Sequence, residues 1–339
     1  MSGLIEKGRG VYKTVEGLFQ TPQQQPKYVT PFESKTRFTM IGPVGSGKTT
    51  IAALMLITAE TRSQDEPGFY CNVLEHGSQI RQAAWNLRAG RFPPKTVPTQ
   101  QYAYESGLEI LRKKFIGDKK IHVPLIDVAG EDQQLMLVKY EGPKAVRNPI
   151  NYVTAKTLLN YMKSSKGHIL TLCAPRVPIP GLDLDKQLET EPEGISNFPD
   201  VNISRMLQEV INYKKGKNIE GIAVVITKWD ILQPYLIEKQ GIDLYTPGGV
   251  EQFMNVYFPG TSMQLKRLKD QGIVRFFPSH VSLQKDENGN VEYWGPNEPK
   301  VEVVTKELDE DGKEKPCLKP KYSEGPYMEM FDFLESYAS

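Results

Sequence analysis

Residues 40–50 read Met-Ile-Gly-Pro-Val-Gly-Ser-Gly-Lys-Thr-Thr, and this stretch indicates how the chain around it folds. It matches the pattern G-x-x-x-x-G-K-[ST], which is typical of a loop that holds phosphate. The residues before it, Arg37–Ile41, predict a short buried strand, and the residues after it, Thr50–Ile57, predict a helix. A glycine-rich turn that binds nothing is the alternative, but the flanking strand and helix favour a nucleotide phosphate site.

The predicted loop offers a contact to each part of a phosphate chain. Its glycines let the backbone turn tightly and point N–H groups inward, and the helix start adds a partial positive charge. We expect Lys48 to reach the outer phosphates, as a binding and catalytic group, and the Thr49 hydroxyl to ligate Mg²⁺. The nucleotide-binding residues predicted here are Gly42, Val44, Gly45, Ser46, Gly47, Lys48, Thr49 and Thr50.

The composition of the chain is that of a globular protein without a charge bias. Of its 339 residues, 39% are hydrophobic and 24% are charged, which is enough for a core and a solvated surface. The net charge of +1 gives no reason to expect nucleic-acid binding. The cysteines and histidines show no disulfide framework or zinc spacing. Without a signal peptide or a transmembrane segment, a cytoplasmic protein is expected.

Strand-like and helix-like runs alternate from Thr36 onward, which predicts an α/β fold with a mostly parallel sheet and an antiparallel edge strand. We expect one domain over 36–339, with insertions at about 61–95 and 174–200 and a C-terminal hairpin and helix over 283–339. The elements expected at particular places are a polar loop (Thr61–Phe69), an antiparallel pair (Tyr102–Leu111 and Lys120–Ile126), a helix within Gly248–Lys269, a last parallel strand (Ile273–Phe277), an edge hairpin (Val291–Val304), a charged loop (Glu307–Pro320) and a final helix (Pro326–Tyr337).

Residues 1–35 are expected to stand apart from that domain. Residues 3–19 have the apolar spacing of an amphipathic helix, and the proline- and glutamine-rich residues 20–31 are typical of a linker. Such a helix either packs on the body of the protein or forms an arm for a partner or for peripheral membrane contact.

A second informative stretch is Thr227-Lys228-Trp229-Asp230, which follows the hydrophobic run Ala223–Ile226. The Asp230 carboxylate can accept hydrogen bonds from both N1–H and the exocyclic amine of guanine, a donor pair that adenine lacks. The stem of Lys228 can lie over the base, and Thr227 can brace the loop. A surface turn is the plainer interpretation, but the position at a strand end favours a guanine-binding loop.

A carboxylate for the metal is expected after another hydrophobic strand. The pattern Asp-x-x-Gly begins at four places in the chain, so the pattern alone decides nothing. Only Asp127 follows a run that predicts a buried strand, Ile121–Ile126. We therefore expect Asp127 to hold Mg²⁺, and the Gly130 amide to contact the terminal phosphate.

These three motifs, in this order, resemble those of the translation-factor-related and Ras-like (TRAFAC) class of P-loop GTPases. Gly42–Thr49 is similar to the first motif of that class, Asp127–Gly130 to the third and Thr227–Asp230 to the fourth. The resemblance covers roughly residues 36–282. It implies a P-loop NTPase fold, a three-layer αβα sandwich with a Ras-like G domain and insertions, which binds GTP or GDP with Mg²⁺ as cofactor.

The resemblance implies two further motifs. Phe277-Pro278-Ser279-His280 occupies the place of the fifth, in which a backbone amide contacts the guanine oxygen; Ser279 is similar to the serine of Ser-Ala-Lys, whereas His280 departs from the usual small residue. Thr96 and Thr99 both fit the second motif, a threonine that closes over Mg²⁺. Thr96 is preferred because Arg91–Thr96 resembles the Trp-Pro-x-x-Thr element of the prokaryotic double-GTPase branch.

The residue after the third motif departs from the Ras-like pattern. Glutamine orients the attacking water there in Ras-like members, but this chain has Glu131, with Gln133 two positions later. A carboxylate near phosphates is repelled and donates no hydrogen bond unless protonated. Three alternatives remain: Glu131 acts as a weak base, Gln133 takes the place of the glutamine, or neither acts and turnover is slow until a partner supplies an arginine. We predict slow intrinsic hydrolysis.

The leading hypothesis is a GTP-hydrolysing switch in which GTP orders Arg91–Thr99 and Val128–Pro143 for a protein effector or activator. A nucleotide-binding scaffold with negligible turnover is the second hypothesis, favoured by Glu131. An ATP-using P-loop enzyme is the third, and it would require Thr227–Asp230 to be a coincidence.

Overall fold

The computed structural model describes much of the chain between residues 36 and 338. The described ranges are 36–42, 45–74, 78–94, 105–114, 117–126, 158–173, 199–214, 219–246, 248–269, 273–296, 298–308 and 314–338. The predicted N-terminal helix and linker over 1–35 lie outside these ranges, and so do residues 174–198 of the predicted insertion.

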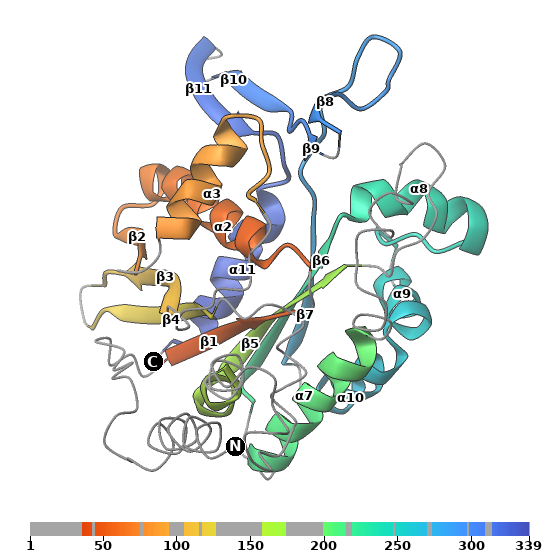
Figure 1. Cartoon of the computed structure of the whole chain (residues 1–339). Coiled ribbons are helices and arrows are strands. Elements are labelled where there is room, and N and C mark those ends of the chain that lie inside the picture. Colours follow the sequence, from red (N-terminus) through yellow and green to blue (C-terminus); the bar gives the residue numbers. More distant parts are fainter. Residues whose placement is uncertain are drawn as a thin grey trace, which may run out of the picture.

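The centre of the molecule is a seven-stranded, mostly parallel sheet that is strongly curled (Figure 1). Its strands, in sheet order, are β2 (Phe69–Val73), β3 (Glu105–Arg112), β4 (Lys119–Ile126), β1 (Thr36–Ile41), β5 (Gly167–Cys173), β6 (Gly221–Thr227) and β7 (Val274–Ser279). Strands β4, β1, β5, β6 and β7 run parallel, and β3 pairs antiparallel with both β4 and β2. The mostly parallel α/β sheet is thus confirmed. The antiparallel strand was expected at the edge, but β3 lies one strand inside it, because β2 pairs with its outer side.

Helices cover both faces of the sheet. The first face carries α2 (Lys48–Asp65), α3 (Ser78–Arg88) and α11 (Gly325–Ser336), and the second carries α7 (Pro199–Lys214), α8 (Trp229–Gln240), α9 (Gly249–Tyr257), α10 (Pro259–Lys269) and the helical residues 158–164. Within the described ranges, no helix is long and apolar enough to span a membrane.

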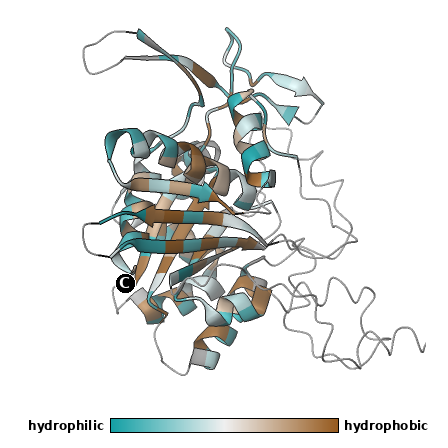
Figure 2. Ribbon diagram, turned by 90° about the vertical axis from the view of Figure 1, so that its left-hand side faces the viewer, coloured by the Kyte–Doolittle hydropathy of each residue, from teal (hydrophilic) through white to brown (hydrophobic). Residues whose placement is uncertain are grey.

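Alternating side chains of the central strands supply the two cores. On β6, Ala223 and Val225 point into the core beneath α2 and α11, whereas Val224 and Ile226 point into the core beneath α7 and α9. Successive residues of a strand face opposite sides, so a strand covered on both sides is apolar throughout. Figure 2 shows hydrophobic residues along the central strands accordingly.

The helices differ from the sequence-based expectations in three places. Helix α2 continues to Asp65, so the polar loop predicted over Thr61–Phe69 is wrong for its first half. The reason is tertiary, since Arg62 is buried there against the aromatic ring of Phe69, at 4.7 Å. Helix α8 was not predicted. The helix expected within Gly248–Lys269 is two helices, because α9 ends at Tyr257 and Pro259 begins α10.

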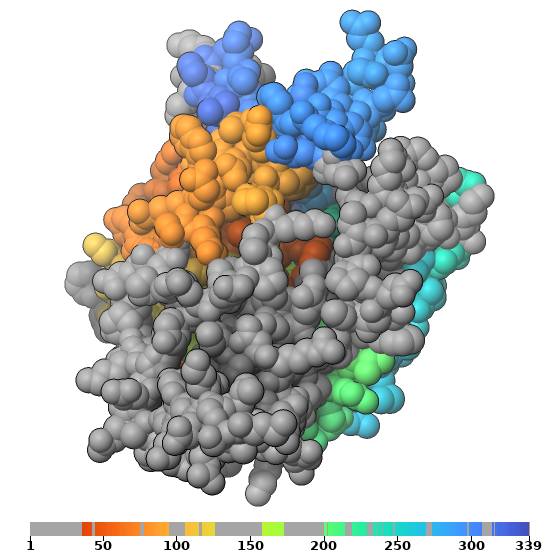
Figure 3. Space-filling view, in the orientation of Figure 1, coloured from red at the N-terminus to blue at the C-terminus, as the bar shows by residue number. Residues whose placement is uncertain are grey.

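The residues that follow β7 form two ribbons outside the main sheet. Strands β8 (Tyr293–Gly295) and β9 (Glu298–Pro299) make the first, and β10 (Val303–Leu308) and β11 (Glu314–Pro320) make the second. The hairpin predicted over Val291–Val304 is present as β8 and β9, but it lies outside the main sheet instead of at its edge, and the charged loop predicted over Glu307–Pro320 contains β11. Both ribbons project beyond α3 at the top of the molecule (Figure 3).

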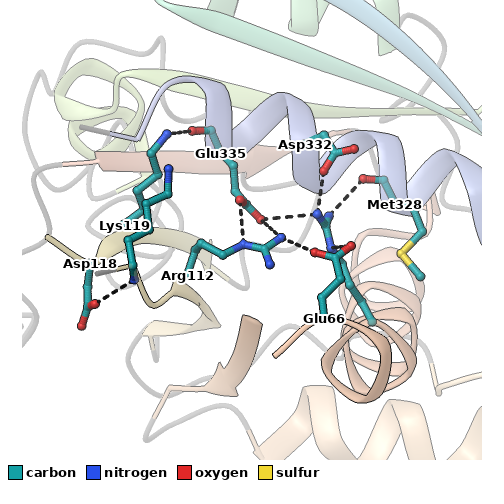
Figure 4. Close-up of polar contacts among 9 residues, drawn as sticks. Glu66, Arg112, Asp118, Lys119, Met328, Asp332 and Glu335 are labelled. Atoms are coloured by element: carbon teal, nitrogen blue, oxygen red, sulfur yellow. Dashed lines mark hydrogen bonds and ion pairs between the residues drawn. The ribbon is translucent and has the colours of Figure 1, made fainter. Parts of the chain in front are cut away.

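The C-terminal helix α11, confirmed close to its predicted bounds, packs on α2 through a group of ion pairs. Arg62 of α2 lies 2.7 Å from Asp332, and Arg112 of β3 lies 3.1 Å from Glu335. Glu66 pairs with both arginines, and Figure 4 shows Arg112 between Glu66 and Glu335. These contacts fix α11 against the helix that begins at the glycine-rich loop.

Candidate functional site

The predicted site residues that the structure describes lie at one edge of the sheet. Parallel strands place their carboxyl ends at the same edge, and ligands of open α/β sheets bind there, where the strand order reverses. Here β1 is that point, because the three strands that follow it in the chain, β2 to β4, lie on one side of β1 and the next three, β5 to β7, lie on the other. The register aligns Cys173 with Thr227 and Thr227 with Ser279, so the ends of β5, β6 and β7 are level.

The glycine-rich loop leaves β1 at this edge with a backbone that only glycine adopts readily. Gly45 and Gly47 have φ angles of 69° and 82°, both in the left-handed region. Gly47 is the N-cap of α2, and no side chain caps that helix. Lys48 begins α2, and its ammonium group donates a hydrogen bond to the Gly42 carbonyl at 2.9 Å. The loop therefore presents a helix N-terminus and a lysine together, an arrangement suited to an anion.

The loop is held against β5 by a buried hydroxyl pair. The Thr171 hydroxyl donates to the Ile41 carbonyl at 3.2 Å, and the Ser46 hydroxyl lies 2.8 Å from Thr171 Oγ1. Gly42 passes so close that a β-carbon there would overlap the hydroxyl and carbonyl oxygens of Thr171. Thr171 was not predicted as a site residue; a polar residue inside the apolar strand Ile169–Cys173 was the signal that could have found it.

The loop is also held by β6. The Thr227 hydroxyl lies 3.1 Å from the carbonyl oxygen of Ser46 and 3.1 Å from that of Leu172, so its proton is shared between them. Thr227 is 6% exposed, and water hardly competes for these contacts. The predicted bracing role of Thr227 thus has a defined geometry, in which it connects the guanine-loop candidate to the phosphate-loop candidate.

The residue after Thr227 has a strained backbone. Lys228 has a φ of 58°, and among the described residues it is the only non-glycine residue in the left-handed region. Such a conformation costs about 1–3 kcal/mol and is concentrated at functional sites. Lys228 is exposed and is the N-cap of α8, which places Asp230 in the first turn of that helix. The side chain of Asp230 is outside the described part of the structure.

Ser279 ends β7 beside Thr227, but its side chain is directed into the protein. It is 3% exposed, and its hydroxyl is hydrogen-bonded to the hydroxyl of Tyr327 on α11. Only its backbone is therefore suited to a base, as the resemblance implies. His280 follows directly and is half-buried. Nothing in the sequence pattern pointed to Tyr327.

Several predicted site residues fall outside the described residues, and these are Val44, Thr96, Thr99, Asp127, Gly130, Glu131 and Gln133. In the parallel pair of β1 and β4, Thr36 lies opposite Ile121, and the two strands continue for the same number of residues beyond that pair. Strand β4 therefore ends level with β1, at the same edge of the sheet. Asp127 directly follows this end. The described ranges contain no group of three or more metal-ligating His, Cys, Asp or Glu residues.

Comparison with models of known protein families finds no match. A search among curated proteins finds none either. The functional argument therefore rests on the residues and geometry of this chain.

Proposed function

We propose that this protein is a GTP-binding P-loop protein of the TRAFAC class, with a Ras-like G domain, that hydrolyses GTP slowly and acts as a switch. The observation that carries the proposal is the hydrogen bond from Thr227 to Ser46, at 3.1 Å. It joins two loops whose sequences independently predict phosphate and guanine contacts. Their side-by-side position at the carboxyl edge of the sheet is what a nucleoside phosphate requires.

Each end of the nucleotide has a chemical counterpart. The N–H groups at the start of α2 and the Lys48 ammonium would hold the phosphates, because both present positive charge at the same place. The Asp230 carboxylate would accept two hydrogen bonds from guanine, and adenine has no matching donor pair. The strained Lys228 would place its stem along the base.

The proposed metal site uses oxygen ligands, which Mg²⁺ prefers. Thr49 is the second residue of α2, and Asp127 and Thr96 would complete the set with water. Bound Mg²⁺ would neutralise charge on the outer phosphates. In this chain Gly130 would contact the terminal phosphate, and Glu131 or Gln133 would stand nearest the attacking water. Because neither matches the Ras-like glutamine, turnover is expected to be slow until a protein partner assists.

Nucleotide affinity tests the proposal directly. Purified protein should bind GDP and GTP with Mg²⁺ much more tightly than ADP and ATP, and Asp230→Ala should abolish that preference. Asp65→Ala, on the exposed end of α2, is the matched control and should keep it. Equal affinity for ADP, or an indifferent Asp230→Ala variant, would contradict the guanine-binding loop.

A rescue experiment separates loss of recognition from loss of folding. Asp230→Asn presents one carbonyl and one amide donor, which suit xanthine, whose carbonyl oxygen replaces the guanine amine. This variant should lose GDP affinity and gain affinity for xanthosine diphosphate. A variant that keeps its GDP affinity and gains none for xanthosine diphosphate would show that Asp230 does not read the base edge.

Single-turnover hydrolysis distinguishes a switch from a scaffold. The expected intrinsic rate is about 10⁻⁴ to 10⁻³ s⁻¹, the range of unassisted Ras-like switches. Tight nucleotide retention with no phosphate release would instead favour the nucleotide-binding scaffold, and a rate far above that range would contradict the expectation of slow intrinsic hydrolysis.

A further inference from the structure

The proposed position of Ser279 beside the guanine base does not explain the contacts of its side chain. It is the last residue of β7, level with Thr227, and its hydroxyl is bound inside the protein to Tyr327 of α11. The two residues are 48 positions apart in the chain. The backbone that reaches the nucleotide edge is therefore held by a helix from the C-terminus.

Tyr327 is suited to hold that backbone. Its side chain is 1% exposed, and burial raises the pKa of its phenol well above the ordinary value, so the hydroxyl keeps its proton. Its ring packs edge-on against Tyr322, with the ring centroids 5.7 Å apart. The geometry leaves the hydroxyl of Tyr327 facing the end of β7.

The neighbouring tyrosine extends the connection to α2. The hydroxyls of Tyr322 and Thr58 are 2.8 Å apart, and Thr58 lies fully buried on the helix that begins at Lys48. Burial raises the pKa of Tyr322 as well, so this contact also involves a neutral phenol. A continuous row of side chains thus runs from Ser279 through two tyrosines to Thr58.

Backbone pairing supports the same connection. Val281 forms an antiparallel bridge with Tyr322, and the Ser282 amide donates to the Lys321 carbonyl at 2.8 Å. The segment after Ser279 is therefore paired with the segment that leads into α11. The ion pairs of Figure 4 fix the other end of α11 to α2 and β3.

We propose that Tyr327 is a positioning residue for the base side of the nucleotide site. It holds Ser279, and through it the backbone of Ser279 and His280, at the distance from Thr227 that guanine requires. This inference rests on the proposed function and extends it, because α11 then sets base affinity although it lies outside the recognised motifs. Removal of the hydroxyl loosens the base edge and leaves the phosphate loop in place.

The test compares the loss of the hydroxyl from each of the two tyrosines that pack against each other, Tyr327 and Tyr322. Tyr327→Phe removes the buried hydroxyl that faces Ser279, whereas Tyr322→Phe removes a partly buried hydroxyl that faces Thr58. Tyr327→Phe should raise the Kd for GDP about fivefold, the worth of one hydrogen bond, and leave the weak Kd for ADP unchanged. Tyr322→Phe should keep the ratio of the two affinities. Thermal unfolding of both variants measures any general loss of stability.

A second variant removes the same hydrogen bond from the other side. Ser279→Ala should match Tyr327→Phe, and the double variant should be no weaker than either single one, because one interaction has been lost. If the two tyrosine variants change the GDP-to-ADP ratio equally, or if neither changes it, the inference is overturned. If the unaltered protein fails to bind GDP, the proposed function itself fails, which is a distinguishable result.

Discussion

The side-chain hydroxyl of Thr227 lies 3.1 Å from the carbonyl oxygen of Ser46, although the two residues are 181 positions apart. The contact is buried and connects the end of β6 with the loop before α2. Because it joins the two loops from which the function is inferred, it is the first contact to disrupt.

Thr227→Val should reduce both stability and nucleotide affinity. Valine has the same shape but no hydroxyl, so the carbonyls of Ser46 and Leu172 would lose their shared donor. The expected loss is about 1–3 kcal/mol of unfolding free energy. Chemical denaturation and GDP titration measure the two effects. Thr305→Val, on the exposed face of β10, should change neither, and an unaltered GDP affinity in Thr227→Val would exclude the bracing role.

Gly42→Ala should displace the phosphate loop from β5. Its β-carbon would overlap both oxygens of Thr171, one of which belongs to the backbone and cannot rotate away. Overpacking of this kind costs about 1–3 kcal/mol. We expect lower thermal stability together with lost GDP binding. Gly295→Ala is the control because a β-carbon there meets nothing within 4 Å; equal behaviour of the two variants would refute this account.

Arg62→Met should weaken the docking of α11. The Arg62 side chain is 6% exposed, but its partners Asp332 and Glu66 are 65% and 43% exposed, so water screens the charges that remain. We expect the free energy of unfolding to fall by about 1–3 kcal/mol, which is less than the loss on breaking a fully buried ion pair. Hydrogen exchange should show α11 opening before the central strands. The control is Arg205→Met on the exposed side of α7, and an intact α11 in Arg62→Met would disprove the anchoring role.

His122 should make the protein less stable in mild acid. It is 3% exposed, and burial lowers its pKa below the ordinary 6.5 despite the hydrogen-bonded Glu109 at 2.9 Å. The unfolded chain therefore binds the proton more readily. The contribution of neutral His122 to stability is complete above pH 6.5 and is lost as the pH falls toward the lowered pKa of the folded protein.

Denaturation titrations between about pH 7 and about pH 5 measure this effect. His122→Gln should flatten the pH dependence of stability over that range. Glu109 also has a lowered pKa: burial raises it, but Lys120 and His122 together outweigh burial. The stabilising contribution of Glu109 is complete above pH 4.5 and declines at lower pH. The effects of His122 and Glu109 on stability therefore fall in different pH ranges. An equal slope in His122→Gln would rule out His122 as its source.

Local patterns predicted the elements that carry strong signals. The strand before the glycine-rich loop and the antiparallel pair formed by β3 and β4 are where hydrophobic runs place them. The patterns failed where distant contacts override local preference. Arg62 keeps α2 helical through a segment that reads as a loop, and the ribbon strand β11 lies in a segment that reads as charged loop.

The candidate site divides in the same way. Gly42, Ser46, Lys48 and Thr227 could be predicted as site residues because glycine spacing and a strand followed by Thr-Lys-x-Asp are local features of the sequence. Thr171 and Tyr327 could not be assigned a role from the sequence, since each acts through a partner that the chain supplies from another strand or helix.

By itself, the sequence determined most of the alternation of strands and helices and the glycine-rich turn before α2, because these depend on residues close in the chain. Only the tertiary structure decided that Thr227 meets Ser46 and that Tyr327 meets Ser279. Such contacts depend on the register of parallel strands and on the docking of α11. Both arise from packing across the whole sheet, which no short stretch of sequence specifies.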